Sequence, residues 1–367
     1  MAANAKSGGR ELKFSLCMIV KDEEGVLGRC LESAEGLADE IVVADTGSAD
    51  RTREIAAKYT DKIFSFAWTD DFSAARNFSF SKGSGDYLFW LDADDVIPPP
   101  SRDAFFRLKE RLSALPESAL PDTILCPYDA GADCTYLRER FVRRVSFSGW
   151  QGCVHECITP GNKTEISDFR VGHRPAEKSR GSRNLDIYRK NIARGYAMNA
   201  RDKYYYGREL YHSALYTEAA AMLREMLADP AGWAVNKIDA CRILARCRIA
   251  AGKREEGYEA LFHSLSFGEP RAGTLNEIAD LFAGDSRPRE AIWWYSAALN
   301  CRSHAADGDF ESPFDLSLRP LLGLTVCLWE TGDKAGAVDA HRRAAALFPD
   351  HPAVRFNAEF FHARGLL

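Results

Sequence analysis

The sequence predicts an open α/β domain followed by an all-α repeat domain. From Phe14 to about Gly172, short apolar strands alternate with amphipathic helices, a pattern typical of a mainly parallel, Rossmann-like sheet. After about Ser182 the strand patterns stop and the chain reads as helical. With 367 residues the chain has room for two domains. We therefore expect a disordered lead-in at 1–12, an α/β domain at 13–182 and a helical domain at 183–367.

Five segments are predicted as buried strands because they are short, apolar and rich in β-branched or aromatic residues. These segments are 14–20, 40–45, 62–66, 87–91 and 123–126. The intervening segments 24–34, 50–59 and 101–112 carry helical spacing. Ligands of such sheets bind at the carboxyl ends of the strands. The polar residues that follow the first, second and fourth strands should therefore meet in one cleft.

Small residues recur at equivalent turn positions in the second half. The pairs are Ala214/Ala219, Gly252/Gly257, Ser286/Ala291 and Gly332/Ala337. A recurrence near 34 residues predicts tetratricopeptide helix pairs, in which small residues let two helices pack closely. Residues 307–313 look like an insertion that lengthens the last interval. A generic α-helical bundle is the alternative.

The composition is that of a soluble globular protein. Hydrophobic residues make up 46% of the chain, and the formal net charge of −5 argues against a nucleic-acid binder. No window reaches the ~20 apolar residues of a membrane span, and the first ten residues lack the apolar core of a signal peptide. The ten cysteines are not densely spaced, which favours reduced thiols. We therefore expect a cytoplasmic protein.

The aromatic-rich strand 87–91 ends in Asp92-Ala93-Asp94. An Asp-x-Asp sequence at a strand end places two carboxylates on the same side of the chain. Mg²⁺ and Mn²⁺ prefer oxygen ligands and are often held by one or two carboxylates plus substrate phosphates. The motif thus indicates a metal site for a nucleotide diphosphate. A strand end followed by an ordinary helix start is the alternative.

Three further motifs precede this one in a fixed order. They are Lys21-Asp22-Glu23, Asp45-Thr-Gly47-Ser-Ala-Asp50 and Asp71-Phe-Ser-Ala-Ala-Arg76-Asn77. Any one of them is ordinary turn or cap chemistry. Their succession over residues 13–185 resembles the family 2 glycosyltransferases of the GT-A fold. With its helical tail, the chain is similar in layout to the bacteriocin S-glycosyltransferases, which modify a peptide cysteine.

The resemblance implies roles for the matching residues in nucleotide-sugar binding. Asp45 would bind the uracil N3, and Asp22 or Glu23 would help form the nucleoside pocket. Arg76 would approach the sugar or the diphosphate. The remaining residues of this set are Gly47, Asp92, Ala93 and Trp150. For Trp150, stacking on a sugar ring and simple core packing remain open.

The resemblance also implies the metal and the base. Asp92 and Asp94 would hold Mn²⁺ or Mg²⁺ against the two phosphates, with His173 completing the metal shell. An inverting transfer needs a base for the acceptor's proton. Glu156 is the first choice for this base and His155 the second. Because 153–157 reads as a strand, the two side chains should point to opposite faces, so only one of them faces the cleft.

These observations predict a metal-dependent glycosyltransferase that moves a sugar from a UDP-sugar to a Cys or Ser side chain of a peptide or protein, with inversion. The acceptor would dock on the helical domain, because stacked helix pairs form grooves suited to peptides. The sequence is compatible with a homodimer. The alternatives are transfer to a lipopolysaccharide core or lipid-linked glycan, and a non-catalytic UDP-binding repeat scaffold.

Overall fold

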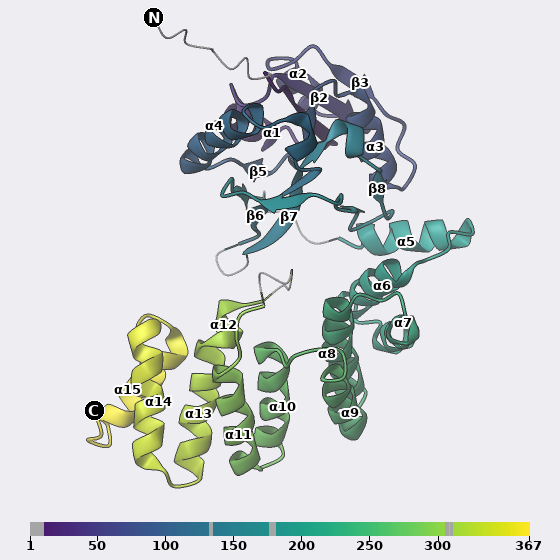
Figure 1. Ribbon diagram of the computed structural model, residues 1–367. Coiled ribbons are helices and arrows are strands. Elements are labelled where there is room, and N and C mark those ends of the chain that lie inside the picture. Colours follow the sequence, from purple (N-terminus) through teal and green to yellow (C-terminus); the bar gives the residue numbers. More distant parts are fainter. Residues whose placement is uncertain (1–10, 132–134, 176–180, 305–307, 309–310) are drawn as a thin grey trace, which may run out of the picture. The chain divides into compact units, whose positions relative to one another are not determined.

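The computed structural model describes residues 11–131, 135–175, 181–304, 308 and 311–367. The chain divides into two compact units, Met1–Tyr196 and Ala197–Leu367 (Figure 1). Most of the expected lead-in lies outside the described residues, and Leu12 at its end is buried in the core. The expected boundary after residue 182 precedes helix α5 (Arg183–Ala193), which the structure groups with the first unit. Hydrogen bonds from α5 to residues 69, 70 and 154 explain this grouping.

The first unit is built on a mixed sheet. Its strands are β1 (Phe14–Val20), β2 (Glu40–Asp45), β3 (Ile63–Ser65), β4 (Tyr87–Phe89), β5 (Asp95–Val96), β6 (Thr123–Asp129), β7 (Thr135–Arg143), β10 (Thr164–Ile166) and β11 (Val171–His173). The order is β3-β2-β1-β4-β7-β6-β11-β5, with β10 beside β6. Strands β1 to β4 pair in parallel, as expected. Strand β7 runs antiparallel to both β4 and β6 and was not predicted, because charged residues interrupt its apolar pattern.

Helices cover both faces of this sheet. They are α1 (Leu27–Ala34), α2 (Thr52–Ala56), α3 (Phe72–Lys82) and α4 (Pro99–Ser113). Alternate residues of β1 enter two cores, since Phe14 belongs to one cluster and Cys17 to the other. Asp71 caps the start of helix α3, and its side chain accepts a hydrogen bond from Ala74 N at 3.0 Å. Phe80 of α3 packs in the smaller core.

A short hairpin packs against α3. It consists of β8 (Trp150–Gln151) and β9 (Cys157–Ile158), which pair antiparallel. The prediction of a strand over 153–157 is wrong, because residues 153–155 form a bend. His155 has a φ of +53°, a left-handed conformation that no strand contains. The expectation that His155 and Glu156 alternate across a strand therefore does not apply.

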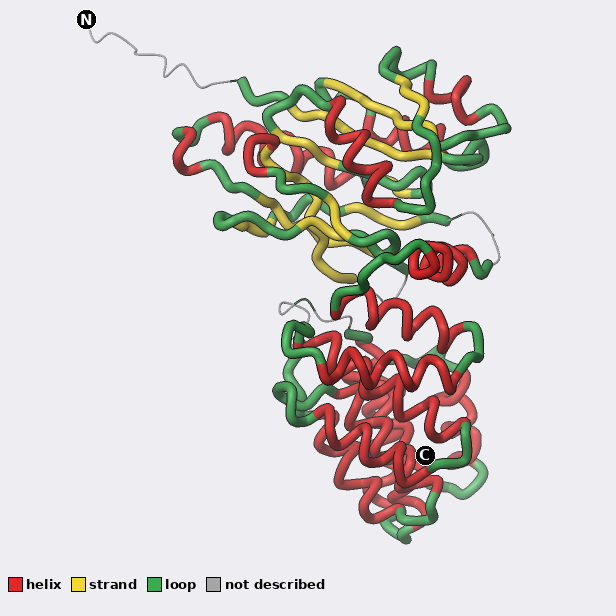
Figure 2. The backbone as a smooth tube through the Cα atoms, turned by 90° about the vertical axis from the view of Figure 1, so that its right-hand side faces the viewer, coloured by secondary structure: helices red, strands yellow, loops and turns green. Residues whose placement is uncertain are grey.

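The second unit consists of helix pairs that lie side by side (Figure 2). The pairs are α6 (Ala200–His212) with α7 (Tyr216–Ala228), α8 (Ala234–Ala250) with α9 (Arg254–Ser264), α10 (Ala272–Gly284) with α11 (Pro288–Leu299), and α13 (Leu318–Glu330) with α14 (Lys334–Leu347). Helix α15 (Pro352–His362) follows them. The short α12 (Pro313–Leu316) begins at the last residue of the expected insertion 307–313, part of which is outside the described residues.

The small residues that predicted these pairs explain their packing. The turn residues all have left-handed backbones, with φ of +58° at Ala214, +75° at Gly252, +57° at Ser286 and +88° at Gly332. Each second residue of a predicted pair is buried in the helix after the turn, where its size allows close approach to the neighbouring helix. The tetratricopeptide-like architecture is thus confirmed.

Candidate active site

The loops after β1 and β2 interlock at one edge of the sheet. Because these strands are parallel neighbours, with Val20 opposite Asp45, their carboxyl ends lie together. Ser48 Oγ accepts a hydrogen bond from Asp22 N at 3.0 Å, and Asp22 Oδ1 accepts one from Ala49 N at 2.8 Å. The Glu23 N–H donates a hydrogen bond to Thr52 Oγ1, at the start of α2, at 2.8 Å. The structure therefore brings the predicted nucleoside-pocket residues together.

Asp45 is a buried carboxylate at the centre of this region, with 4% of its surface exposed. It accepts hydrogen bonds from Ser48 N at 3.2 Å and from Arg53 Nη1, also at 3.2 Å. Gly47 has a φ of +103°, and a Cβ placed there would meet no atom within 4 Å. The backbone conformation of this turn therefore favours glycine at position 47, and the space beside the glycine is open.

Asp94, Asp95 and His173 form a group suited to a metal ion, with one ligand atom from each within 4.8 Å of the others. Strand β11 pairs antiparallel with β5 and places His173 opposite Asp95. The Nδ1 atom of His173 is 3.5 Å from Asp94 Oδ1 and 3.8 Å from Asp95 Oδ1. This Nδ1 atom is buried and makes no hydrogen bond with the described residues. Two predicted ligands, Asp94 and His173, are thus brought together, and the structure adds Asp95.

Asp94 and Asp95 have different surroundings. Asp95 is fully buried and accepts hydrogen bonds from Tyr128 Oη at 2.9 Å and Asp92 N at 3.0 Å. Burial, together with the nearby Asp92 and Asp95 carboxylates, raises the pKa of Asp94. The pKa of His173 is raised by Asp95 first and then by Asp94. A divalent cation would relieve the repulsion between these carboxylates, so the donor set fits Mn²⁺ or Mg²⁺.

Arg76 lies between two carboxylates. Its Nη2 atom is 2.7 Å from Asp92 Oδ1, and its Nε atom is 2.5 Å from Glu156 Oε1. The guanidinium also lies over the rings of Trp90 and Trp150, at 4.7 and 4.9 Å from their centroids. Burial opposes ionisation of Asp92, but Arg76 and neighbouring arginines lower its pKa overall. Metal binding by Asp92 stays a prediction, as does sugar binding by Arg76.

The other predicted site residues differ in accessibility. Trp150 is 3% exposed, and its ring packs against Phe80 and Trp90 with centroids 5.6 and 5.3 Å away. This packing agrees with the alternative in which Trp150 is a core residue. Ala93 is 6% exposed and belongs to the larger core. His155 ends the bend, and Glu156 lies between it and β9. The choice of base between the two residues stays a prediction.

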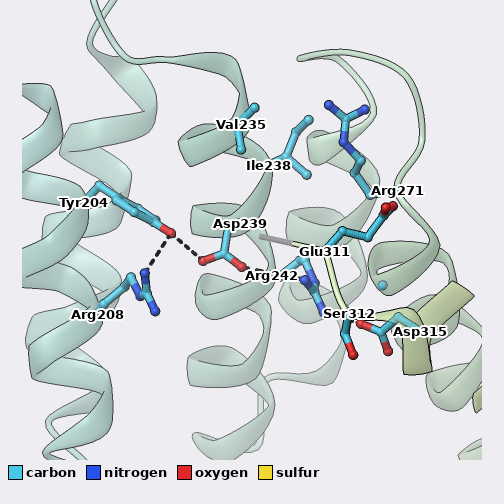
Figure 3. Close-up of a pocket in the computed structure, with 11 residues that line it drawn as sticks. Tyr204, Arg208, Val235, Ile238, Asp239, Arg242, Arg271, Glu311, Ser312 and Asp315 are labelled. Atoms are coloured by element: carbon cyan, nitrogen blue, oxygen red, sulfur yellow. Dashed lines mark hydrogen bonds and ion pairs between the residues drawn. The ribbon is translucent and has the colours of Figure 1, made fainter. Parts of the chain in front are cut away.

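A separate cavity of about 180 Å³ lies within the helical unit (Figure 3). It is lined by residues of α6, α8, the start of α10 and the segment 311–315. On one side Tyr204 Oη donates a hydrogen bond to Asp239 Oδ2 at 2.8 Å, and Arg208 Nη1 lies 3.4 Å from the same hydroxyl. Sequence reasoning did not find these residues, because charged side chains on a helix usually indicate only a solvated face.

Comparison with known proteins bears on both units. Residues 15–109 match the family model for glycosyl transferase family 2. A TPR repeat-containing protein of Synechococcus elongatus is 38% identical over 152 residues, 41% of this chain and 36% of that protein. The lipopolysaccharide core biosynthesis glycosyltransferase LpsC of Rhizobium meliloti is 32% identical, covering 44% of this chain and 62% of that protein.

The SPbeta prophage-derived glycosyltransferase SunS of Bacillus subtilis is 26% identical, covering 53% of this chain and 48% of that protein. The chain therefore matches between about a third and three fifths of the length of these curated relatives. Among solved structures, Pseudomonas aeruginosa PilF aligns over 48% of this chain and 73% of its own, with 22% identity and a TM-score of 0.37. Within the described residues, no helix has both the length and the apolar character needed to cross a bilayer.

Proposed function

Because the chain carries a glycosyl transferase family 2 domain followed by tetratricopeptide-like repeats, we propose that it transfers a sugar from a UDP-sugar in a metal-dependent, inverting reaction. The observation that carries this proposal is the grouping of Asp94, Asp95 and His173. Asp94 and Asp95 follow β4, which is parallel to and beside β1, so they lie at the same sheet edge as the loops that carry Asp22 and Asp45. The pairing of β11 with β5 brings His173 to them.

The loops after β1 and β2 would hold the nucleoside. Asp45 would accept the N3–H of uracil, and its hydrogen bonds to Ser48 N and Arg53 keep the carboxylate oriented for this. Asp22 and Glu23 would form the wall of this pocket beside the Gly47 turn. Ala93 would let the chain pass close to the ribose or the diphosphate, because its side chain is small.

Asp94, Asp95 and His173 would hold the metal, and Asp92 would add the carboxylate oxygen that Arg76 does not contact. A bound Mn²⁺ or Mg²⁺ would supply positive charge that neutralises the diphosphate and makes UDP a better leaving group. Glu156 would take the proton of the attacking acceptor group. Its side chain is 10% exposed and Arg76 holds it in place, as a positioned base requires.

The acceptor would be a side chain of a peptide or protein that docks on the helical unit. The cavity among α6, α8 and α10 offers hydrogen-bonding groups for such a segment, including Arg208 and Asp239. A lipopolysaccharide core is the second candidate acceptor, because a relative of this chain is named for that pathway. We expect the reaction to take place in the cytoplasm, where UDP-sugars are available.

The test is UDP release from a panel of UDP-sugars, measured with Mn²⁺, with Mg²⁺ and with a chelator. Peptides that contain Cys or Ser and core oligosaccharides would be added in turn as acceptors. We expect one UDP-sugar to give metal-dependent release that one acceptor class accelerates. UDP binding without turnover would favour the non-catalytic scaffold. Neither binding nor turnover would contradict the proposal.

A further inference from the structure

Helix α3 holds the β8–β9 hairpin at several points. Phe72 N donates a hydrogen bond to Cys153 O at 3.0 Å. Asn77 binds both main-chain groups of Trp150, since its Nδ2 donates to the carbonyl at 3.0 Å and its Oδ1 accepts from the N–H at 2.8 Å. These residues belong to one short sequence motif, and their partners all lie in the segment that ends at Glu156. The motif therefore fixes the hairpin as a unit.

Arg76 of the same motif extends this contact to the other side of the site. One edge of its guanidinium binds Glu156 on the hairpin, and a second binds Asp92 in the turn after β4. An arginine stays charged at any working pH, and its planar fork fixes the direction of both bonds. The rings of Trp90 and Trp150 hold the guanidinium in place, and the Arg76 side chain is only 7% exposed.

The charges explain why this bridge matters. The Glu156 side chain is 10% exposed and that of Asp92 is 37% exposed, so water screens their mutual repulsion only in part. A single cation between the two carboxylates compensates both charges. Without it, Glu156 would lose its only ion-pair partner within the described residues. The position of the Glu156 carboxylate relative to the Asp92–Asp95 turn would then depend on the hairpin backbone alone.

We propose that Arg76 is a positioning residue that holds Glu156 at a fixed place relative to the Asp92–Asp95 turn, rather than a ligand of the sugar donor. Asn77 secures the other end of the same hairpin. The inference rests on the proposed function, in which Glu156 takes the acceptor's proton. It also gives the Asp71–Asn77 motif a role on the acceptor side of the site, whereas the family resemblance places Arg76 at the donor.

The activity test compares Arg76→Lys and Arg76→Met with the wild type and with Arg143→Met as a matched control. Arg143 also lies in the first unit and pairs with a carboxylate outside the motif, Glu117 at 2.8 Å. For Arg76→Met we expect kcat to fall about 100-fold, while the donor KM stays within about threefold. Arg76→Lys should recover part of kcat because it keeps the charge. Arg143→Met should change neither constant.

A raised donor KM with unchanged kcat in Arg76→Met would overturn the inference, because it would show a direct contact with the donor. Hydrogen exchange provides a readout that does not need turnover. We expect faster exchange over residues 150–158 in both Arg76 variants and not in Arg143→Met. Unchanged exchange there would also contradict the positioning role. If the wild type turns over no UDP-sugar, the proposed function fails, and the exchange experiment still decides whether Arg76 holds the hairpin.

Discussion

Both units bury charged side chains, but they balance these charges differently. In the helical unit, Glu277 lies 2.6 Å from both Arg242 and Arg246, and Asp315 lies 2.9 Å from Arg319. In the first unit, the ion-pair partner of Asp94 among the described residues is His173, at 3.5 Å. Arginines thus balance the carboxylates of the helical network, and Arg76 and Arg140 do the same for Asp92 and Asp95 at the sheet edge. The pairing of Asp94 with a histidine instead leaves this carboxylate available to a cation from outside.

Neutralising Asp94 should have the largest effect on activity. In Asp94→Asn we expect metal-dependent UDP release to fall by about a thousandfold or more, because a catalytic metal contributes several kcal/mol. Circular dichroism should show an unchanged fold. Asp168→Asn is the control, since Asp168 is an exposed carboxylate paired with Arg107. Normal metal-stimulated turnover in Asp94→Asn would mean that the metal binds elsewhere or plays no part.

A somewhat smaller effect is expected at the proposed base. Glu156→Gln should lower kcat about 100-fold, because the variant keeps the shape of the side chain but cannot accept the proton. Binding of UDP and of Mn²⁺, followed by calorimetry, should stay close to wild type. His155→Gln is the informative partner variant. If His155→Gln loses kcat and Glu156→Gln does not, His155 is the base.

The smallest effect is expected in the helical unit, where the charges are already balanced. Glu277→Gln leaves Arg242 and Arg246 without this partner, and we expect the free energy of unfolding of that unit to fall by about 2 kcal/mol. Donor hydrolysis without acceptor should not change. Urea unfolding monitored by the helical signal measures the first quantity. A loss of hydrolysis in Glu277→Gln would show that the two networks do not have separate roles.

Much of the fold follows from local sequence signals. The strand segments were found because their apolar runs are local. The turns at Ala214, Gly252, Ser286 and Gly332 were found because small residues recur there with a period near 34 residues. The pairing of Asp94 with His173 came from the family resemblance and from the place of His173 just before the helical half. Asp95 stood in the same carboxylate run, but only the pairing of β5 with β11 shows that it faces His173.

The remaining features depend on tertiary contacts that no local pattern encodes. Arg76 and Glu156 are 80 residues apart in the chain, and their ion pair exists only because α3 packs on the hairpin. The left-handed backbone at His155 likewise interrupts what reads as an alternating strand. The antiparallel β7 was missed because its charged residues suggest an exposed segment, although Arg140 within it is fully buried.

The most direct test of the central claim is a titration with Mn²⁺ followed by electron paramagnetic resonance, with and without UDP. We expect the wild type to bind one Mn²⁺ more tightly when UDP is present. Asp94→Asn should lose this binding, and Glu277→Gln should keep it. Equal Mn²⁺ binding by the wild type and by Asp94→Asn would contradict the claim that the sheet-edge carboxylates form the metal site.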